Sequence, residues 1–195
     1  MSIPTIQLDT GTTGSGVPAV KFPSIGSKVV VGIVNIEEYQ QYKDDVPQVW
    51  ERDGSPKMGK RVYGLVVSTV PGDDGQGPTV KDNDQDRPVE PGELVTFYCE
   101  GGRHYTWKDA VTAADGAFVG DVMQWAFVEQ KPPAKPTHTG QKVYQAQIRR
   151  PEARDGDLPT RCVEAYQQLQ QGPQLQAAAP TAQTQQAPAH LEEPF

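Results

Sequence analysis

The apolar residues of this chain lie in short runs separated by segments rich in Gly, Pro and Asp, which is the pattern of a β protein. The clearest run, 28–36, is rich in β-branched residues and is too short and glycine-interrupted for a helix. We expect it to form a buried strand that continues through Tyr39. Similar runs predict four further strands, at 61–69, 93–100, 119–128 and 142–149.

Two segments have the pattern of helices instead. In 105–114, Thr106 is in position to be the N-cap, with Asp109 three residues later and Gly116 beyond the end. In 157–171, apolar residues recur at i, i+4, i+8 and i+11, and Pro159 suits a first turn. We expect this second helix to dock on the sheet; the alternative is a helix for self-association.

Three strands, one helix and two strands are the element order of the OB-fold, a five-stranded barrel. The sequence therefore predicts an all-β fold with one or two short helices, in the order β-β-β-α-β-β. Another small barrel, or an open α+β sheet with the same order, is the alternative. The predicted organisation is a flexible N-terminal arm, an OB-fold domain, a candidate helix and a disordered linker with an acidic tip, at 1–20, 21–150, 157–171 and 172–195.

Charge is unevenly distributed along the 195 residues, whose net charge is −7. The acids are concentrated in the Gly/Asp/Pro-rich segment 71–91, which we expect to be a flexible, solvated loop, and in the tail. The remainder of the body is close to neutral, so a basic groove on it is compatible with the overall acidity.

The sequence excludes several function classes. Residues 1–16 lack the features of a signal peptide, and no segment approaches the ~18 apolar residues of a membrane helix, so we expect a protein with no membrane partner. Cys99 and Cys162 are far apart and in no metal or nucleophile motif, and we expect Cys99 to be a buried apolar residue. The histidines have no ligand spacing. We therefore predict no enzymatic activity, no metal and no cofactor.

The candidate binding residues are in the two connections that clamp ligands in an OB-fold, between strands one and two and between strands four and five. Binding of single strands requires cations for phosphates and flat aromatic faces on which bases stack. Both are present here, and the Asp53-Gly54 pair predicts a tight turn in the first connection. The predicted nucleic-acid-binding residues are Tyr42, Lys43, Trp50, Arg52, Lys57, Lys60, Arg61, Tyr63, Lys131 and Lys135.

The aromatic residues divide into three groups. Trp50 has few apolar neighbours in the sequence, so we expect it to be exposed. Tyr63 and Tyr98 can face either side, because a shift of one residue in register reverses the face. Four further aromatic side chains are expected in the core or against the end of the barrel: Phe97, Trp107, Trp125 and Phe127.

The stretch from Trp50 to Lys57, followed by 65–69, resembles a segment of single-stranded DNA-binding proteins of phages that infect mycobacteria and related actinobacteria. Phe22-Pro23-Ser-Ile-Gly26 resembles their entry to strand one. Tyr144-Gln-Ala146-Gln-Ile148 resembles their last strand, with Ile148 in place of a second Tyr. The resemblance implies a phage protein that acts in the bacterial host cytoplasm.

The end of the chain, His190-Leu-Glu-Glu-Pro-Phe195, follows a segment of almost only Gln, Ala, Pro and Thr. It resembles the C-terminal tip of bacterial single-stranded DNA-binding proteins, in which acids precede Ile-Pro-Phe. Here Glu193 takes the place of Ile. The resemblance implies that replication or recombination proteins bind the tip through Glu192, Glu193, Pro194 and Phe195; the alternative is a solvated terminus.

We therefore expect sequence-independent binding of single-stranded DNA in phage replication or recombination, by a possible homo-oligomer with a partner-recruiting tip. The alternatives are a protein–protein adaptor or minor virion protein on the same barrel, and an RNA-binding barrel, because stacking and phosphate contacts do not distinguish the sugars.

Overall fold

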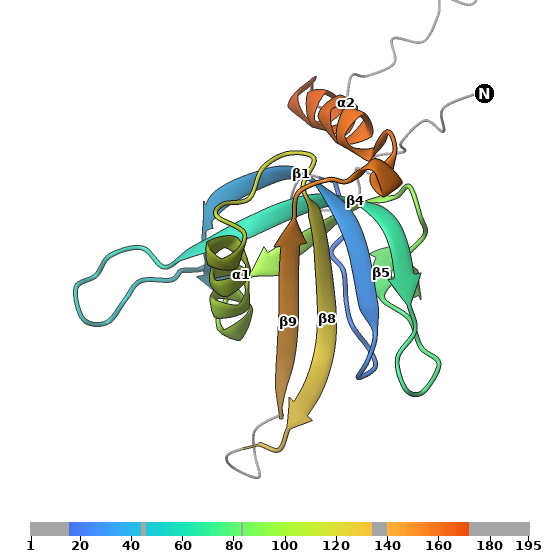
Figure 1. Ribbon diagram of the computed structural model, residues 1–195. Helices are drawn as coiled ribbons and strands as arrows, with labels where there is room; N and C mark the ends of the chain where they lie inside the picture. Colours follow the sequence, from blue (N-terminus) through green and yellow to red (C-terminus); the bar gives the residue numbers. More distant parts are fainter. Residues whose placement is uncertain (1–15, 44–45, 83, 134–139, 172–195) are drawn as a thin grey trace, which may run out of the picture.

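Five antiparallel strands form the main sheet in the computed structural model, which describes residues 16–43, 46–82, 84–133 and 140–171. Their order in space is β7-β4-β1-β8-β9 (Figure 1). All five predicted strands are confirmed, and the first two are longer than expected. Their bounds are β1 (Lys28–Gln40), β4 (Met58–Val70), β7 (Leu94–Cys99), β8 (Val122–Lys131) and β9 (Gln141–Arg149). No pairing between β7 and β9 closes the sheet within the described residues.

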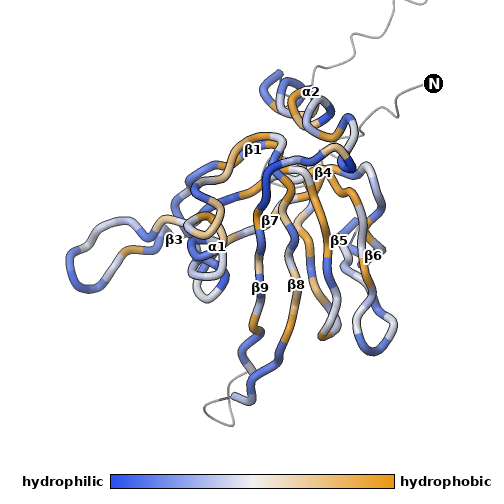
Figure 2. Tube along the Cα trace, in the orientation of Figure 1, coloured by the Kyte–Doolittle hydropathy of each residue, from blue (hydrophilic) through white to orange (hydrophobic). Residues whose placement is uncertain are grey.

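The inner face of this curved sheet carries the main core, because alternate residues of a strand point to the same side. Val29 and Val31 of β1 are fully buried there, next to Met123 and Trp125 of β8. The apolar segments therefore converge between the strands (Figure 2). The predicted burial of four further residues is confirmed: Phe97, Cys99, Trp107 and Phe127.

Helix α1 (Gly102–Ala113) lies beside β9 and contacts both β9 and β7 (Figure 1). It begins earlier than predicted, because Gly101 is the N-cap with a φ of 50°. Thr106 lies inside the helix, where its hydroxyl donates to the carbonyl of Gly102, so the predicted capping box is wrong. The end is as expected, since Gly116 adopts a φ of 109° just beyond it.

Helix α2 (Leu158–Gln171) packs on the outer face of β1 and β4, which confirms the predicted docking (Figure 1). Its residues Leu158, Cys162 and Ala165 are buried against Tyr63 and other apolar side chains of the sheet. Gly32 makes this approach possible, because a Cβ there would lie 2.5 Å from the Cys162 sulfur. Neither described helix has the length and apolar content needed to cross a membrane.

The two thiols provide a direct test of this packing. Burial raises the pKa of Cys99 to about 12 and that of Cys162 to about 11. In the folded protein both pKa values are above the ordinary thiol pKa. The buried thiols therefore contribute to stability at pH values below the ordinary thiol pKa, and this contribution is lost as the pH rises through the folded-state pKa values. At about pH 8 we expect a disulfide reagent to modify neither cysteine in the native protein and both in denaturant. Fast native modification of Cys162 alone would show that α2 detaches.

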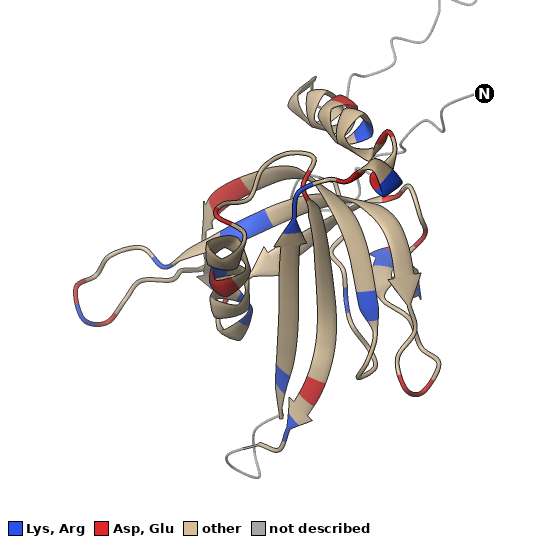
Figure 3. Ribbon diagram, in the orientation of Figure 1, with Lys and Arg blue, Asp and Glu red and all other residues tan. Residues whose placement is uncertain are grey.

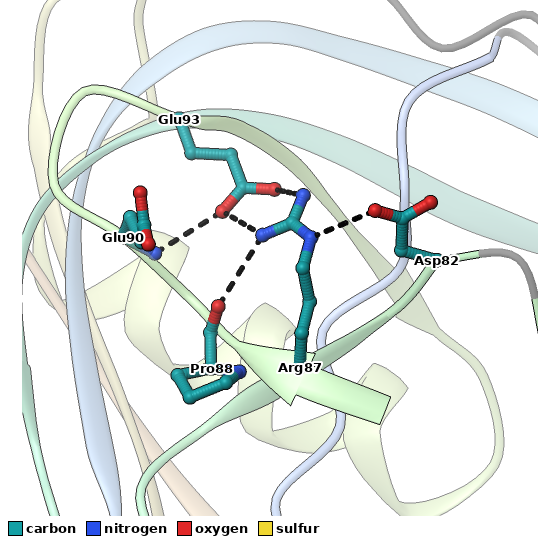
Figure 4. A network of polar contacts seen from close by, with 5 residues as sticks. All are labelled: Asp82, Arg87, Pro88, Glu90 and Glu93. Atoms are coloured by element: carbon teal, nitrogen blue, oxygen red, sulfur yellow. Dashed lines mark hydrogen bonds and ion pairs between the residues drawn. The ribbon is translucent and has the colours of Figure 1, made fainter. Parts of the chain in front are cut away.

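Segment 71–91 differs from the predicted flexible loop. It contains a two-stranded hairpin, β5 (Thr79–Asp82) and β6 (Gln85–Pro88), and Val80 and Val89 reach the core. Arg87 fixes this hairpin to the turn before β7 (Figure 4). Its guanidinium donates to both oxygens of Glu93, at 2.6 and 3.1 Å, and its Nε donates to Asp82 at 3.3 Å. Part of the acidity of the segment is thus used in internal contacts.

The N-terminal segment also packs on the body. The N–H of Val20 donates to the carbonyl of Thr96 at 2.9 Å, and the N–H of Thr96 donates to the carbonyl of Pro18 at 2.8 Å. Val17, Val20 and Phe22 are buried. Residues 17–20, which were expected to belong to a flexible N-terminal arm, are therefore packed on the body. The backbone of this segment pairs with the edge of β7.

Arg150, just after β9, joins three elements at one end of the sheet. Its guanidinium is paired with Asp121, whose side chain is only 3% exposed. It also donates to the carbonyls of Ala114 and Asp115 beyond α1, at 3.2 and 3.1 Å, and lies 4.5 Å from the ring of Phe118. Arg150 therefore satisfies both a buried carboxylate and the C-terminal end of α1.

Candidate nucleic-acid interface

The connection between β1 and β4, residues 41–57, extends beyond the sheet and is called the arm here (Figure 1). It contains the short strands β2 (Tyr42–Lys43) and β3 (Val46–Pro47). Backbone hydrogen bonds of 2.8 Å join Gln41 to both Lys57 and Gln48, and Gln48 to Lys57. The arm is therefore a small hydrogen-bonded structure.

A turn over residues 50–55 of the arm holds Trp50 in place. The N–H of Trp50 donates to the carbonyl of Ser55, and the N–H of Gly54 donates to the carbonyl of Trp50, both at 2.8 Å. Asp53 accepts hydrogen bonds from the N–H and the hydroxyl of Ser55. Only Gly54 of the Asp53-Gly54 pair has a positive φ, so the turn is wider than the predicted two-residue turn.

The arm presents two aromatic rings to solvent. Trp50 is 54% exposed, which confirms the expectation for this residue, and Tyr42 is 63% exposed. The ammonium of Lys57 lies 5.1 Å from the centroid of the Trp50 ring, within the range of a cation–π contact. A flat aromatic face and a cation are thus side by side on the arm.

A second group of side chains, Tyr39, Arg61 and Tyr98, lies at the base of the arm and is called the platform here. The guanidinium carbon of Arg61 is 5.2 Å from the centroid of each tyrosine ring, and the two rings meet edge to face. Gly59 permits this arrangement, because a Cβ there would lie 2.8 Å from the Tyr39 ring. All three platform residues are partly exposed.

Two acids hold the platform in its present form. The hydroxyl of Tyr39 donates to Glu100, and burial together with this hydrogen bond raises the pKa of Tyr39 above its ordinary value. Arg61 donates to the Tyr63 hydroxyl at 3.2 Å and lies 3.9 Å from Glu37. Its Nε is buried and has no hydrogen-bond partner among the described residues. The contacts to Glu100 and Glu37 fix the platform side chains relative to one another.

The structure separates the other predicted residues. Tyr63 is 2% exposed and packs under α2, so it cannot serve as a stacking surface. Lys60 is paired with Glu38, and Arg52 with Asp53. Lys43 is exposed on the arm, and Lys131 is exposed at the end of β8, away from the arm (Figure 1). Lys135 and the tip residues Glu192, Glu193, Pro194 and Phe195 lie outside the described residues.

Charge around the candidate site is mixed in sign rather than uniformly basic (Figure 3). Two acids of β1, Glu37 and Glu38, pair with the cations Arg61 and Lys60 at the base of the arm, whereas Lys57 and Lys131 make no ion pair with another described residue. The expected basic groove is thus reduced to a few separate cations. Tyr39 was not among the binding residues predicted from the sequence. Two features could have indicated it: Tyr39 and Glu37 are two positions apart on β1 and so face the same side, and Gly59 has no side chain to block the packing of an aromatic ring.

The described residues contain no group of three or more His, Cys, Asp or Glu side chains that could hold a metal ion. Fold and site together define a mostly β protein with a five-stranded antiparallel sheet, two packed helices and an exposed aromatic arm. The chain matches no protein-family model, no curated protein and no solved structure.

Proposed function

We propose that this protein binds single-stranded DNA with little sequence preference, through the arm and the platform. The observation that supports this most directly is the exposed ring of Trp50 with the Lys57 ammonium over it. Bases of every kind can stack on such a ring, at ~1–3 kcal/mol each. The fixed turn around Trp50 reduces the entropy that would be lost on binding.

The fold supports the same proposal. A sheet of order β7-β4-β1-β8-β9 has the strand sequence of an OB-fold barrel that is open between its third and fifth strands. In such a barrel the face of the second and third strands binds oligonucleotides. Arg61 of β4 and Tyr98 of β7 are paired across those two strands, which supports binding at the platform.

The biological setting is part of the proposal. The resemblance to actinobacteriophage proteins favours a non-enzymatic role in phage DNA replication or recombination, in the host cytoplasm. The acidic Pro-Phe tip would then bind a replication or recombination protein. Deletion of residues 191–195 should leave DNA affinity unchanged and remove that partner.

A protein–protein adaptor is the second candidate, and one observation favours it. Val46, Val49 and Met58 are exposed on or next to the arm, at 59%, 46% and 45%. Aliphatic side chains contribute little to base stacking but much to protein interfaces. In this case the aromatic rings of the arm would bind protein.

Titration of tryptophan fluorescence with oligo-dT, oligo-rU and duplex DNA distinguishes these candidates. We expect oligo-dT to quench the fluorescence and duplex DNA to bind more weakly, because paired bases cannot reach the Trp50 ring. Comparison of oligo-dT with oligo-rU tests the preference for DNA. Absence of quenching by either oligonucleotide would support the adaptor function.

Salt dependence tests the role of the unpaired cations. Because Lys60 and Arg61 are engaged with acids and Lys131 lies away from the arm, we expect phosphate contacts mainly from Lys43 and Lys57, with a log–log slope of about −1.4 at roughly −0.7 per phosphate. Lys57→Ala should flatten the slope by about 0.7. Lys60→Ala, the matched control, should change it little. If Lys57→Ala and Lys60→Ala changed the slope equally, Lys60 would contact phosphate in spite of its ion pair with Glu38.

A further inference from the structure

Tyr63 connects helix α2 to the platform. Its ring is buried in the apolar cluster that α2 forms with the sheet, together with Leu158 and Cys162 of the helix. Its hydroxyl, at the other end of the same rigid side chain, contacts Arg61 and Glu37. One side chain therefore belongs both to the packing of α2 and to the candidate binding site.

The Tyr63 hydroxyl bridges two charged groups. It accepts a hydrogen bond from Nη1 of Arg61 at 3.2 Å and donates one to Oε2 of Glu37 at 3.1 Å. Nη1 and Oε2 themselves are 3.9 Å apart, which is too far for a direct hydrogen bond. The position of the Arg61 guanidinium therefore depends on the hydroxyl as well as on the carboxylate.

Arg61 in turn lies against both aromatic rings of the platform. Its guanidinium carbon is 5.2 Å from the centroids of the Tyr39 and Tyr98 rings, which come from the strands on either side of β4. Within the described residues, the bond to the Tyr63 hydroxyl is the one hydrogen bond of this guanidinium, because its Nε has no partner there. Loss of the hydroxyl would thus free the guanidinium to move away from the two rings.

These contacts form a chain from α2 to the partly exposed rings of the platform. The helix covers the ring of Tyr63, the hydroxyl holds Arg61, and Arg61 holds Tyr39 and Tyr98. Rings that are held in place before binding lose less entropy when a base stacks on them. Detachment of α2 would uncover the ring of Tyr63, allow it to change rotamer and remove the hydroxyl from Arg61.

We propose that Tyr63 is a positioning residue of the binding site, through which the docking of α2 sets the affinity for single strands. Tyr63 does not contact the DNA; it keeps Arg61 between the two tyrosine rings on which bases stack. This inference rests on the proposed binding of single-stranded DNA at the platform. Because linkage is reciprocal, DNA bound at the platform must also oppose the detachment of α2.

Tyr63→Phe removes the hydroxyl and retains the buried ring. We expect it to weaken oligo-dT binding about three- to ten-fold, as for side chains in direct contact, without changing the salt slope, because no phosphate contact is lost. In an Arg61→Ala background the same substitution should have no further effect. Tyr144→Phe is the matched control, since Tyr144 is also buried and its hydroxyl accepts a hydrogen bond from Arg103 at 2.7 Å. It should leave oligo-dT affinity unchanged.

NMR of the arginine side chains tests the same contacts without DNA. The buried Nε–H of Arg61 should exchange slowly with solvent in the unsubstituted protein and faster in Tyr63→Phe. Gly32→Ala places a Cβ 2.5 Å from the sulfur of Cys162, so it should displace α2 and also speed this exchange. Leu158→Ala, which removes an apolar contact of α2 without adding a clash, is the milder variant and should act in the same direction.

The cysteines report the reciprocal effect. In moderate urea, saturating oligo-dT should slow the modification of Cys162 by a disulfide reagent more than that of Cys99, which lies in the other core cluster. Equal oligo-dT affinity of Tyr63→Phe and the unsubstituted protein would overturn the positioning role, as would unchanged Arg61 exchange in all three variants. If the unsubstituted protein did not bind oligo-dT at all, the proposed function itself would fail.

Discussion

Replacement of Arg150 with alanine is expected to lower the free energy of unfolding by about 3 kcal/mol. The substitution leaves the carboxylate of Asp121 buried, with the N–H of Phe118, at 2.9 Å, as its one remaining partner among the described residues. Removing one partner of a fully buried ion pair costs about 3–5 kcal/mol, and the partial exposure of Arg150 reduces this figure. The carbonyls of Ala114 and Asp115 lose their donor as well. Urea unfolding followed by circular dichroism measures the change.

Two further variants show whether the cause is the buried charge. Arg154→Ala removes an exposed arginine from a surface ion pair and should change stability by less than about 0.5 kcal/mol. Adding Asp121→Asn to Arg150→Ala removes the uncompensated charge, so the double variant should be more stable than the sum of the single effects predicts. Strict additivity would show that the guanidinium acts mainly through the carbonyls beyond α1.

Trp50→Ala is expected to weaken oligo-dT binding by about 5- to 150-fold, which corresponds to the ~1–3 kcal/mol of one stacked base. Stability should change little, because the ring is more than half exposed. Fluorescence anisotropy of a labelled oligonucleotide measures the affinity, since the variant lacks the intrinsic signal of Trp50.

Tyr105 provides the matched control for this prediction. It is an aromatic residue that is 67% exposed and belongs to α1 rather than to the arm. Tyr105→Ala should leave oligo-dT affinity unchanged. If Tyr105→Ala and Trp50→Ala weakened binding equally, the arm would not be the binding surface. If Trp50→Ala instead destabilised the fold, the ring would have a structural role that its exposure does not indicate.

The strands of the main sheet could be predicted from sequence because their apolar residues are consecutive or alternate. The run 28–36 is an example: the residues that fill the core are neighbours in the chain. The hairpin β5–β6 could not be predicted in this way. Val80 of the hairpin and Val89 directly after it are buried but isolated among acids and prolines. Arg87 holds the hairpin in place through a carboxylate outside it.

The candidate site was predictable in part for the same reason. Trp50 has polar neighbours, so its exposure follows from local sequence. The environment of Arg61 does not follow from local sequence, because Tyr39 and Tyr98 come from the strands on either side of it in space. Tyr63 lies only two residues from Arg61, on the same face of β4, yet it is covered by α2. The composition of these strands predicts that cations and aromatic residues are present. Which of their side chains reach solvent depends on the strand register and on the docking of α2.

The segment from Val17 to Phe22 bears on how the protein is made. During synthesis this segment leaves the ribosome early, yet Thr79 and Thr96, with which its backbone pairs, are translated much later. Contacts between such distant residues form slowly, because a long loop must close first. Until β7 is in place, Val17, Val20 and Phe22 remain uncovered and available to chaperones. Newly made chains should therefore pass through a stage in which the strands are assembled and this segment is still accessible to protease.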